Sequence, residues 1–163
     1  MILIRPLEAQ DRDILHRLIR ERGTFNEAEI RVAMELIDDT LSGRDPDYHI
    51  YCAHLQDPQL AASRLSGYIC FGPIPMTEGC YDLYWIVVDQ RHDRQGIGKK
   101  LLHYMEEDLR GKGARQIHVD TSSTPKYIAA RAFYERNGYE PVCVLSDFYQ
   151  EGDDKLIFVK RLP

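Results

Sequence analysis

Residues 87–102 read VVDQRHDRQGIGKKLL, and this stretch decides more about the fold than any other part of the chain. Its first residues end a run of aromatic and branched side chains that begins at Tyr81, a composition typical of a β-strand. From Gly96 to Leu109, apolar residues recur at helical spacing. The stretch therefore predicts a strand that passes directly into a helix through a turn rich in glycine.

The turn itself has the composition of an anion-binding site. At the start of a helix the backbone NH groups lack intrahelical partners, and the positive end of the helix dipole lies there. Gly96 and Gly98 have no side chains that would stand between the backbone and a ligand. Positive charge comes from three residues of the same turn, Arg94, Lys99 and Lys100. These features predict a phosphate or pyrophosphate site, although a plain strand-to-helix connection with glycines that ease packing stays open on spacing alone.

On either side of this stretch, apolar patterns with strand and helix periods alternate. The expected elements are a strand over 2–6, helices over 14–23 and 26–43, strands over 49–55, 65–71 and 81–88, a helix over 96–109, a strand over 117–120, a helix over 127–136, and strands over 142–145 and 156–160. A hairpin with a turn at Asp57-Pro58 is expected between the second and third strands. The strand over 81–88 is expected to be central and buried on both faces, because its apolar run is nearly continuous. The order predicts a mixed sheet covered by helices.

Length and charge narrow the class of protein. The 163 residues suit one domain over 1–163, and the net charge of −5 argues against a nucleic-acid or anionic-membrane partner. The opening run Met1–Pro6 is too short for a signal peptide, and about 18 consecutive apolar residues occur nowhere. A cytoplasmic location is therefore expected.

The cysteines and histidines do not have the spacing of a metal site. Cys52, Cys70, Cys80 and Cys143 are widely separated and sit in apolar, strand-like stretches. We expect them to be reduced thiols that pack as small hydrophobic residues, with neither a disulfide framework nor a zinc site, and we expect no metal cofactor.

The turn resembles the cofactor-binding motif of the GNAT superfamily of N-acetyltransferases, written Q/R-x-x-G-x-G/A. Gly96 and Gly98 fall on the motif's glycines, and Trp85–Val88 resembles the strand that leads into it. Residues 130–139, ARAFYERNGY, resemble the family's second motif, A-x-x-x-Y-E-x-x-G-F/Y. The similarity extends over nearly the whole chain, including the Ile4–Leu7 opening.

The sequence departs from the first motif at Asp93, where Gln or Arg is usual. A carboxylate facing a pyrophosphate would be repelled. We therefore expect Asp93 to point away or to be neutralised, with Arg94 or Arg91 supplying the missing positive charge.

The resemblance implies an α/β (α+β) GNAT fold, with a mixed, mostly antiparallel sheet of six to seven strands flanked by about four helices. It also implies acetyl transfer from acetyl-CoA, or another short acyl-CoA, to a primary amine of a small molecule or a peptide. The cofactor-binding residues that it implies are Ile86, Val88, Arg94, Gln95, Gly96, Ile97, Gly98 and Lys99. Tyr127 stands where the family sometimes has an asparagine, so no cofactor contact is carried over to it.

Two residues are candidates for proton transfer. Tyr134 matches the tyrosine that the family usually employs to protonate the departing thiolate. The reference pKa of a tyrosine is about 10, so its hydroxyl holds that proton at neutral pH. A core tyrosine is the alternative. Among the carboxylates Asp82, Glu78, Glu35 and Asp147, we select Asp82 as the general base, since it begins the central strand. The alternative for Asp82 is a solvated or turn-forming residue.

A different class of function stays open, namely a noncatalytic acyl-CoA sensor or interaction module with the same fold. The oligomeric state is open too. Apolar edge strands near the end of the chain could pair across a homodimer, and a buried packing role explains them equally well.

Overall fold

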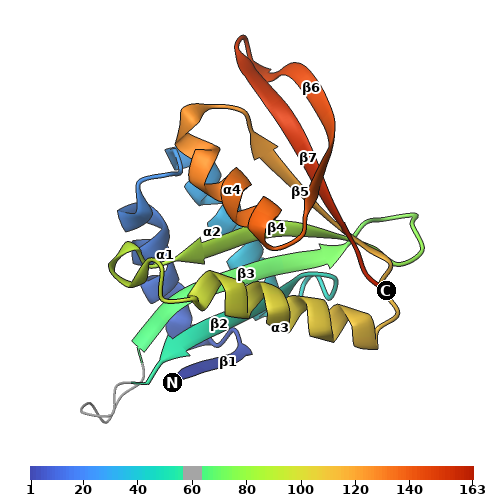
Figure 1. Cartoon of the computed structure of the whole chain (residues 1–163). Helices are drawn as coiled ribbons and strands as arrows, with labels where there is room; N and C mark the ends of the chain where they lie inside the picture. Colours follow the sequence, from blue (N-terminus) through green and yellow to red (C-terminus); the bar gives the residue numbers. More distant parts are fainter. Residues whose placement is uncertain (57–63) are drawn as a thin grey trace. The chain divides into compact units, whose positions relative to one another are not determined.

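A computed structural model of the chain describes residues 1–56 and 64–163 (Figure 1). The predicted turn at Asp57-Pro58 lies outside the described residues. The strands are β1 (Ile2–Pro6), β2 (His49–Leu55), β3 (Arg64–Pro73), β4 (Cys80–Val88), β5 (Gln116–Ser122), β6 (Glu140–Gln150) and β7 (Asp153–Arg161). The α-helices are α1 (Arg12–Arg22), α2 (Glu27–Ser42), α3 (Ile97–Gly111) and α4 (Ile128–Arg136).

The strands form one sheet in the order β1-β2-β3-β4-β5-β7-β6. Strand β4 pairs with β5 in parallel, whereas β1 with β2, β2 with β3, β5 with β7 and β6 with β7 pair antiparallel. The predicted element order and the mixed, mostly antiparallel sheet flanked by helices are confirmed, as is the hairpin of β2 and β3. Strand β4 is the central strand, as predicted.

The chain forms two compact units. Unit 1 contains Met1–Gly72 and Trp85–Glu107, and unit 2 contains Pro73–Tyr84 and Asp108–Pro163. Strand β4 and helix α3 each pass from one unit into the other. A single domain over 1–163 stays a prediction.

In unit 1, α1 and α2 form within one or two residues of the predicted bounds, with α1 beginning at Arg12 instead of residue 14. The capping box of α2 is present, because Asn26 Oδ1 accepts from the Glu29 NH at 2.9 Å and Glu29 Oε2 accepts from the Asn26 NH at 2.7 Å. The apolar faces of both helices pack against the sheet in one buried cluster. Its members are Leu15, Leu18, Ile19, Ile30, Ala33, Met34, Ile37, Ile50, Cys52, Leu65, Tyr68, Cys70 and Val87. Each large apolar side chain buried there contributes about 1.5–3 kcal/mol to stability.

Helix α3 approaches strand β3 closely at Gly67. A Cβ atom at Gly67 would lie 2.9 Å from the Val87 carbonyl oxygen, 3.3 Å from Ile97 Cγ2 and 3.4 Å from Leu101 Cδ1. Only a residue without a side chain fits this space. Gly67 therefore allows the start of α3 to pack directly on the sheet.

The prediction that β4 is buried on both faces is wrong. In β4 only Leu83 and Val87 are buried, and Tyr84 is 37% exposed. Strand β3 is the one in which every residue from Leu65 to Gly72 is buried. An apolar run indicates a strand, but it does not show how many faces of that strand are covered. Because β3 contains small residues, its sequence did not indicate that it is buried.

In unit 2, β6 and β7 form a hairpin that is longer than predicted. The sequence indicated strands over 142–145 and 156–160, but β6 covers Glu140–Gln150 and β7 covers Asp153–Arg161. The polar residues near the hairpin end suggested a loop, and the structure accommodates them with an irregular register between Leu145 and Gln150. The prediction that all four cysteines pack as hydrophobic residues is wrong for Cys143, which is exposed on this edge strand.

Helix α4 packs on unit 2 through aromatic side chains. The Tyr134 ring lies 5.9 Å from the Tyr139 ring and 6.0 Å from the Phe158 ring, measured between centroids. Arg131 Nη1 donates to the carbonyl oxygens of Ser122 at 2.7 Å and Thr124 at 3.0 Å, which ties the helix to the end of β5.

Candidate active site

The predicted cofactor turn connects β4 to α3 within unit 1. A short 3-10 helix over Gln90–His92 follows β4, and the chain then reaches α3 through Arg94 and Gly96. Both residues have positive φ angles, 62° at Arg94 and 80° at Gly96. Residues in this left-handed region form concave arrangements of backbone NH groups that bind anions. A Cβ at Gly96 would meet no atom within 4 Å, so the backbone is open to a ligand there.

The first turn of α3 supplies further NH groups. Ile97, Gly98 and Lys99 occupy its first three positions, where NH groups have no intrahelical acceptor. The side chains of Arg94, Gln95 and Lys99 are exposed. The Ile97 side chain is buried and anchors the helix in the core, so only its backbone NH can contact a ligand.

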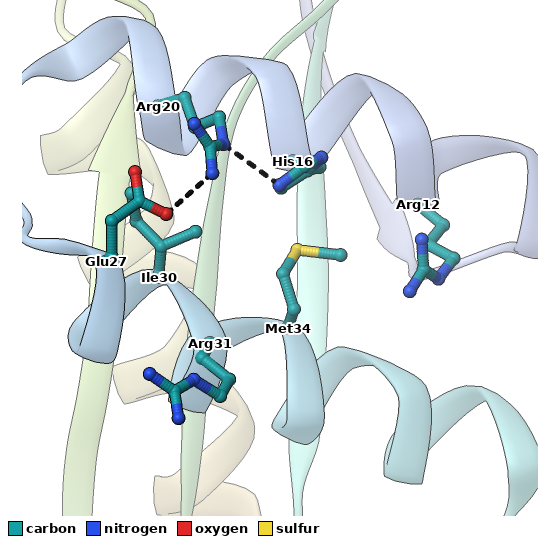
Figure 2. A pocket seen from close by; sticks show the side chains of 7 residues that line it. All are labelled: Arg12, His16, Arg20, Glu27, Ile30, Arg31 and Met34. Atoms are coloured by element: carbon teal, nitrogen blue, oxygen red, sulfur yellow. Dashed lines mark hydrogen bonds and ion pairs between the residues drawn. The ribbon is translucent and has the colours of Figure 1, made fainter.

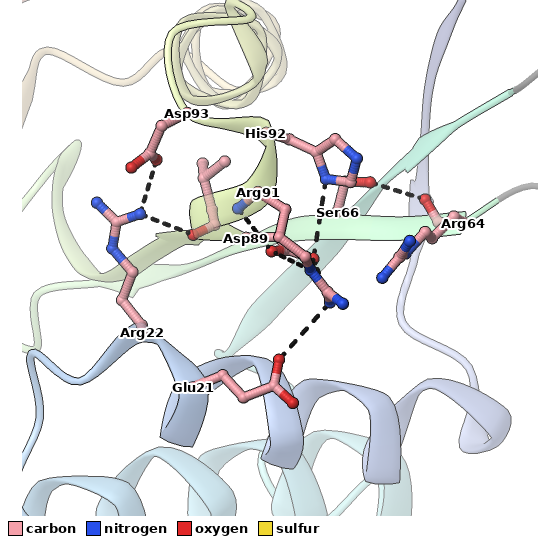
Figure 3. Close-up of polar contacts among 9 residues, drawn as sticks. Glu21, Arg22, Arg64, Ser66, Asp89, Arg91, His92 and Asp93 are labelled. Atoms are coloured by element: carbon pink, nitrogen blue, oxygen red, sulfur yellow. Dashed lines mark hydrogen bonds and ion pairs between the residues drawn. The ribbon is translucent and has the colours of Figure 1, made fainter.

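Asp93, where the sequence departs from the family motif, is neutralised as expected. Arg22, at the end of α1, donates through Nη1 to Asp93 Oδ1 at 2.7 Å and to the Val88 carbonyl oxygen at 3.3 Å (Figure 3). The Arg22 side chain is 29% exposed and that of Asp93 45% exposed, so water weakens the pair only in part. The two residues are 71 positions apart, and no local sequence pattern could have paired them.

Arg91, the other residue expected to supply charge, is engaged with carboxylates. Its Nη2 lies 2.7 Å from Asp89 Oδ2 and 3.6 Å from Glu21 Oε2, and its Nε donates to Asp89 Oδ1 at 2.9 Å (Figure 3). Arg91 holds the pKa of the buried Asp89 carboxyl below its usual value. Glu21 and Arg22 thus join the end of α1 to the turn through two separate ion pairs.

The other predicted cofactor contacts, Ile86 and Val88, lie on β4 before the turn. Both side chains are partly buried. The Val88 carbonyl oxygen accepts from Arg22 as well, so the end of β4 and the turn share one anchor on α1.

Tyr134 lies on α4 in unit 2, with 8% of its surface exposed. Burial raises the pKa of its hydroxyl well above the ordinary value, so the hydroxyl keeps its proton through neutral pH. Its ring is part of the aromatic cluster of α4, with Phe133 also 5.7 Å away between centroids. Burial keeps the proton on the hydroxyl and also makes the hydroxyl a weaker acid, so this environment is that of a core tyrosine at least as much as that of a proton donor.

Asp82 lies on β4 in unit 2, among charged groups of the neighbouring strands. Burial raises the pKa of its carboxyl, and Asp120 raises it further, whereas His118 and Lys155 lower it. The three other carboxylates considered as bases, Glu35, Glu78 and Asp147, are all exposed. Among these four candidates, Asp82 is the one with the partly desolvated setting that a general base needs.

A cavity of about 320 Å³ lies between α1 and α2 in unit 1 (Figure 2). It is lined by Arg12, His16, Arg20, Glu27, Ile30, Arg31 and Met34. Two of its cations already have carboxylate partners, since Arg12 pairs with Asp38 and Arg20 with Glu27, each at 2.6 Å. None of the residues implicated from the sequence lines it.

Within residues 1–56 and 64–163, no group of His, Cys, Asp and Glu side chains is arranged to hold a metal ion. The helices of this same part of the chain are all too short or too polar to span a membrane.

Comparison with known proteins identifies the family. The sequence profile of the Acetyltransferase (GNAT) family matches residues 13–139. A GNAT-family protein from Desulfovibrio desulfuricans has a similar structure, with a TM-score of 0.89 and 37% sequence identity over 99% of each chain. This chain therefore belongs to the GNAT acetyltransferase family and is an enzyme of the acetyltransferase type. No curated protein matches its sequence.

More distant structures share the fold. The ribosomal-protein-S18-alanine N-acetyltransferase from Escherichia coli superposes with a TM-score of 0.74 at 20% identity, over 99% of this chain and 94% of the other. An aminoglycoside 6'-N-acetyltransferase complexed with coenzyme A superposes with a TM-score of 0.73 at 19% identity, over 99% and 98%.

Proposed function

We propose that this enzyme transfers an acetyl group, or another short acyl group, from acyl-CoA to a primary amine. The observation that carries the proposal is the turn before α3, where Arg94 and Gly96 have left-handed backbones and Arg22 takes up the Asp93 carboxylate. Such a turn at a helix N-terminus fits the pyrophosphate of coenzyme A. The aminoglycoside acetyltransferase of the same fold is complexed with coenzyme A, which supports this ligand.

In this proposal the pyrophosphate is held by backbone NH groups of Gly96, Ile97, Gly98 and Lys99 and by the exposed side chains of Arg94, Gln95 and Lys99. Arg91 is already paired with the carboxylates of Asp89 and Glu21. We therefore assign to Arg94 the positive charge that is missing at position 93, where this sequence has Asp93. Ile86 and Val88 contact the acyl and pantetheine parts, and backbone NH groups of β4 stabilise the oxyanion that develops on the thioester.

The chemistry needs two proton transfers. Asp82 accepts a proton from the acceptor ammonium, which leaves a neutral amine that can attack the thioester carbon. The carbon–nitrogen bond forms, the carbon–sulfur bond breaks, and the thiolate takes the proton of the Tyr134 hydroxyl. The raised pKa of Asp82 and the protonated state of Tyr134 support these roles.

The acceptor can be a small molecule or a protein amino group. The E. coli protein of this fold is an N-acetyltransferase of an alanine of ribosomal protein S18, and another protein of the same fold acetylates an aminoglycoside. Both support an amine acceptor for this enzyme.

We propose that the enzyme forms a homodimer, one of the two alternatives that the sequence left open. Edge strand β6 exposes Val142 by 58%, Val144 by 56% and Phe148 by 53%, an apolar surface that a second copy could cover. Light scattering of the purified protein distinguishes a dimer from a monomer. A cytoplasmic location remains a prediction from the sequence.

Two experiments test the proposed function. Coenzyme A added to the isotope-labelled protein should shift the amide resonances of Gly96 and Gly98, and unmoved resonances at saturating ligand would contradict the pyrophosphate site. Release of free thiol from acetyl-CoA should then be measured with a panel of small amines and peptides. Tight coenzyme A binding without turnover on any acceptor would favour the noncatalytic sensor.

A further inference from the structure

Charged side chains from β5 and β7 act on Asp82 of β4 in unit 2. Asp82 lies opposite His118 in the parallel register of β4 and β5. Residues two apart on a strand share a face, so Asp120 lies on the same face of β5 as His118. On β7, Lys155 lies opposite Ser122, and its Nζ forms an ion pair with Asp120 Oδ2.

The Lys155 ammonium is fixed from two sides. Besides the ion pair with Asp120, its Nζ lies 4.7 Å from the centroid of the Phe148 ring on β6. The side chain is only 18% exposed. Asp120 and Tyr149 both raise the pKa of Lys155, so the ammonium stays charged throughout the neutral range. The Asp120 carboxylate and the Lys155 ammonium are therefore held in a fixed arrangement on the face of the sheet that carries Asp82.

We propose that Asp120 and Lys155 are positioning residues that adjust the protonation state of the partly buried Asp82 in opposite directions. The catalytic consequence rests on the proposed function, in which Asp82 is the general base. Neither Asp120 nor Lys155 needs to touch the acceptor for this role.

Asp120 and Lys155 shift the pKa of Asp82 in opposite directions. The groups that act on it are Asp120 and His118 from β5 and Lys155 from β7. The Asp120 charge disfavours a second carboxylate, whereas the Lys155 charge favours it. A general base works best with a pKa near the working pH, which lies well above the ordinary aspartate value of about 3.9. Asp120 raises the pKa of the Asp82 carboxyl toward that range, and Lys155 lowers it and so limits the rise.

Removal of the Asp120 charge should therefore shift the pKa of Asp82 in one direction, and removal of the Lys155 charge should shift it in the other. In Asp120→Asn the carboxylate is lost and Lys155 loses its partner, so the Asp82 carboxyl should titrate at lower pH. In Lys155→Met the ammonium is lost and nothing balances the Asp120 carboxylate, so Asp82 should titrate at higher pH. We expect shifts of up to about one pH unit, because Asp120 is 44% exposed and water screens part of its charge.

The direct measurement is a carbon-13 titration of the Asp82 carboxyl in the free protein, which needs no substrate. Lys155→Arg keeps the charge and should restore the wild-type midpoint. Glu151→Gln removes an exposed carboxylate at the tip of the same hairpin and should leave the midpoint unchanged. Midpoints that coincide in Asp120→Asn and Lys155→Met, or that move the same way, would overturn the inference.

The second measurement is the pH profile of kcat/KM with an accepted amine. Its acidic limb should follow the carboxyl midpoints, lower in Asp120→Asn and higher in Lys155→Met. If the midpoints separate but the acidic limb stays fixed, the coupling stands and the role of Asp82 as base in the proposed function fails. The two failures are thereby distinguished.

Discussion

Tyr134 is a buried tyrosine whose hydroxyl retains its proton at neutral pH, because burial raises its pKa. We predict that Tyr134→Phe lowers kcat by about 100-fold and changes the Kd of coenzyme A by less than about twofold, since it removes a proton donor and little binding surface. Tyr139→Phe, in the same aromatic cluster, is the control and should keep kcat. Thiol release and calorimetry measure the two quantities, and equal losses in both would make Tyr134 a structural residue.

Arg22 neutralises Asp93 beside the proposed pyrophosphate site. We predict that Arg22→Met raises the Kd of coenzyme A by about three- to tenfold, because the unpaired carboxylate then repels the ligand. Asp93→Asn in the same chain should restore the affinity, since no negative charge remains. If calorimetry finds the double variant as weak as Arg22→Met, the charge of Asp93 has no part in binding.

His54 is buried beside the ion pair of Arg5 and Asp11, with its Nε2 3.9 Å from Asp11 Oδ1. Burial, and then Arg5, lower the pKa of His54, so the folded state binds its proton less readily than the unfolded state. The unfolded state therefore takes up protons as the pH falls below about 6.5, and the free energy of unfolding decreases. Asp11, whose pKa is lowered, adds a further loss as the pH falls through its ordinary range near 3.8.

We therefore predict that His54→Gln loses less stability than the wild type between pH 7 and pH 5. Urea unfolding at several pH values measures this. His103→Gln removes an exposed histidine and should keep the wild-type pH dependence. Parallel curves for His54→Gln and the wild type would show that the folded and unfolded states bind this proton equally.

The residues of the cofactor turn could be found from the sequence, because a glycine pair at a helix start leaves a local pattern. The same reasoning recognised that the Asp93 charge needed a partner. It could not supply Arg22, since the pair joins the end of α1 to the turn across 71 positions. The charged groups that act on Asp82 were hidden for the same reason, because strand pairing places Asp120 and Lys155 on its face of the sheet.

At the level of elements, the contact between α3 and β3 depends on Gly67. We predict that Gly67→Ala destabilises the fold by about 1–3 kcal/mol, because its Cβ would lie 2.9 Å from a backbone oxygen that cannot easily move. Gly111→Ala, at the end of α3, is the matched control. A Cβ there meets nothing within 4 Å, so the change should stabilise by up to about 1 kcal/mol through helix propensity. Chemical denaturation measures the free energy of unfolding of both variants. If Gly67→Ala leaves this free energy unchanged, α3 can shift away from the sheet.

Helices were predicted more accurately than strands, and the reason is physical. The Asn26 and Glu29 capping box and the periodic stripe of α2 are local signals that the structure keeps. Burial of a strand depends on what covers each face, which the strand itself does not encode, and β3 and β4 differ from their patterns accordingly. The outer part of β6 continues beyond the predicted strand to Gln150, which pairs with Asp153 of β7 after an irregular register.

At the scale of the whole molecule, two compact units share continuous elements. Strand β4 passes from unit 2 into unit 1 after Tyr84, and α3 passes back after Glu107. In a single domain, unfolding of either unit disrupts β4 and α3 where they cross from one unit to the other, so the hydrogen bonds of both elements weaken together. We therefore predict one cooperative unfolding transition for residues 1–163, with equal calorimetric and van't Hoff enthalpies.

Each unit offers a probe of its own. Trp85 is the single tryptophan and belongs to unit 1, whereas Cys143 on β6 is the exposed cysteine of unit 2 and can carry a fluorescent label. Gly67→Ala lies in unit 1, far in sequence from the label. If the chain is one domain, this change must lower the unfolding midpoint seen by the Cys143 label as much as that seen by Trp85. A shift at Trp85 alone would mean that the units unfold independently and that the chain has two domains.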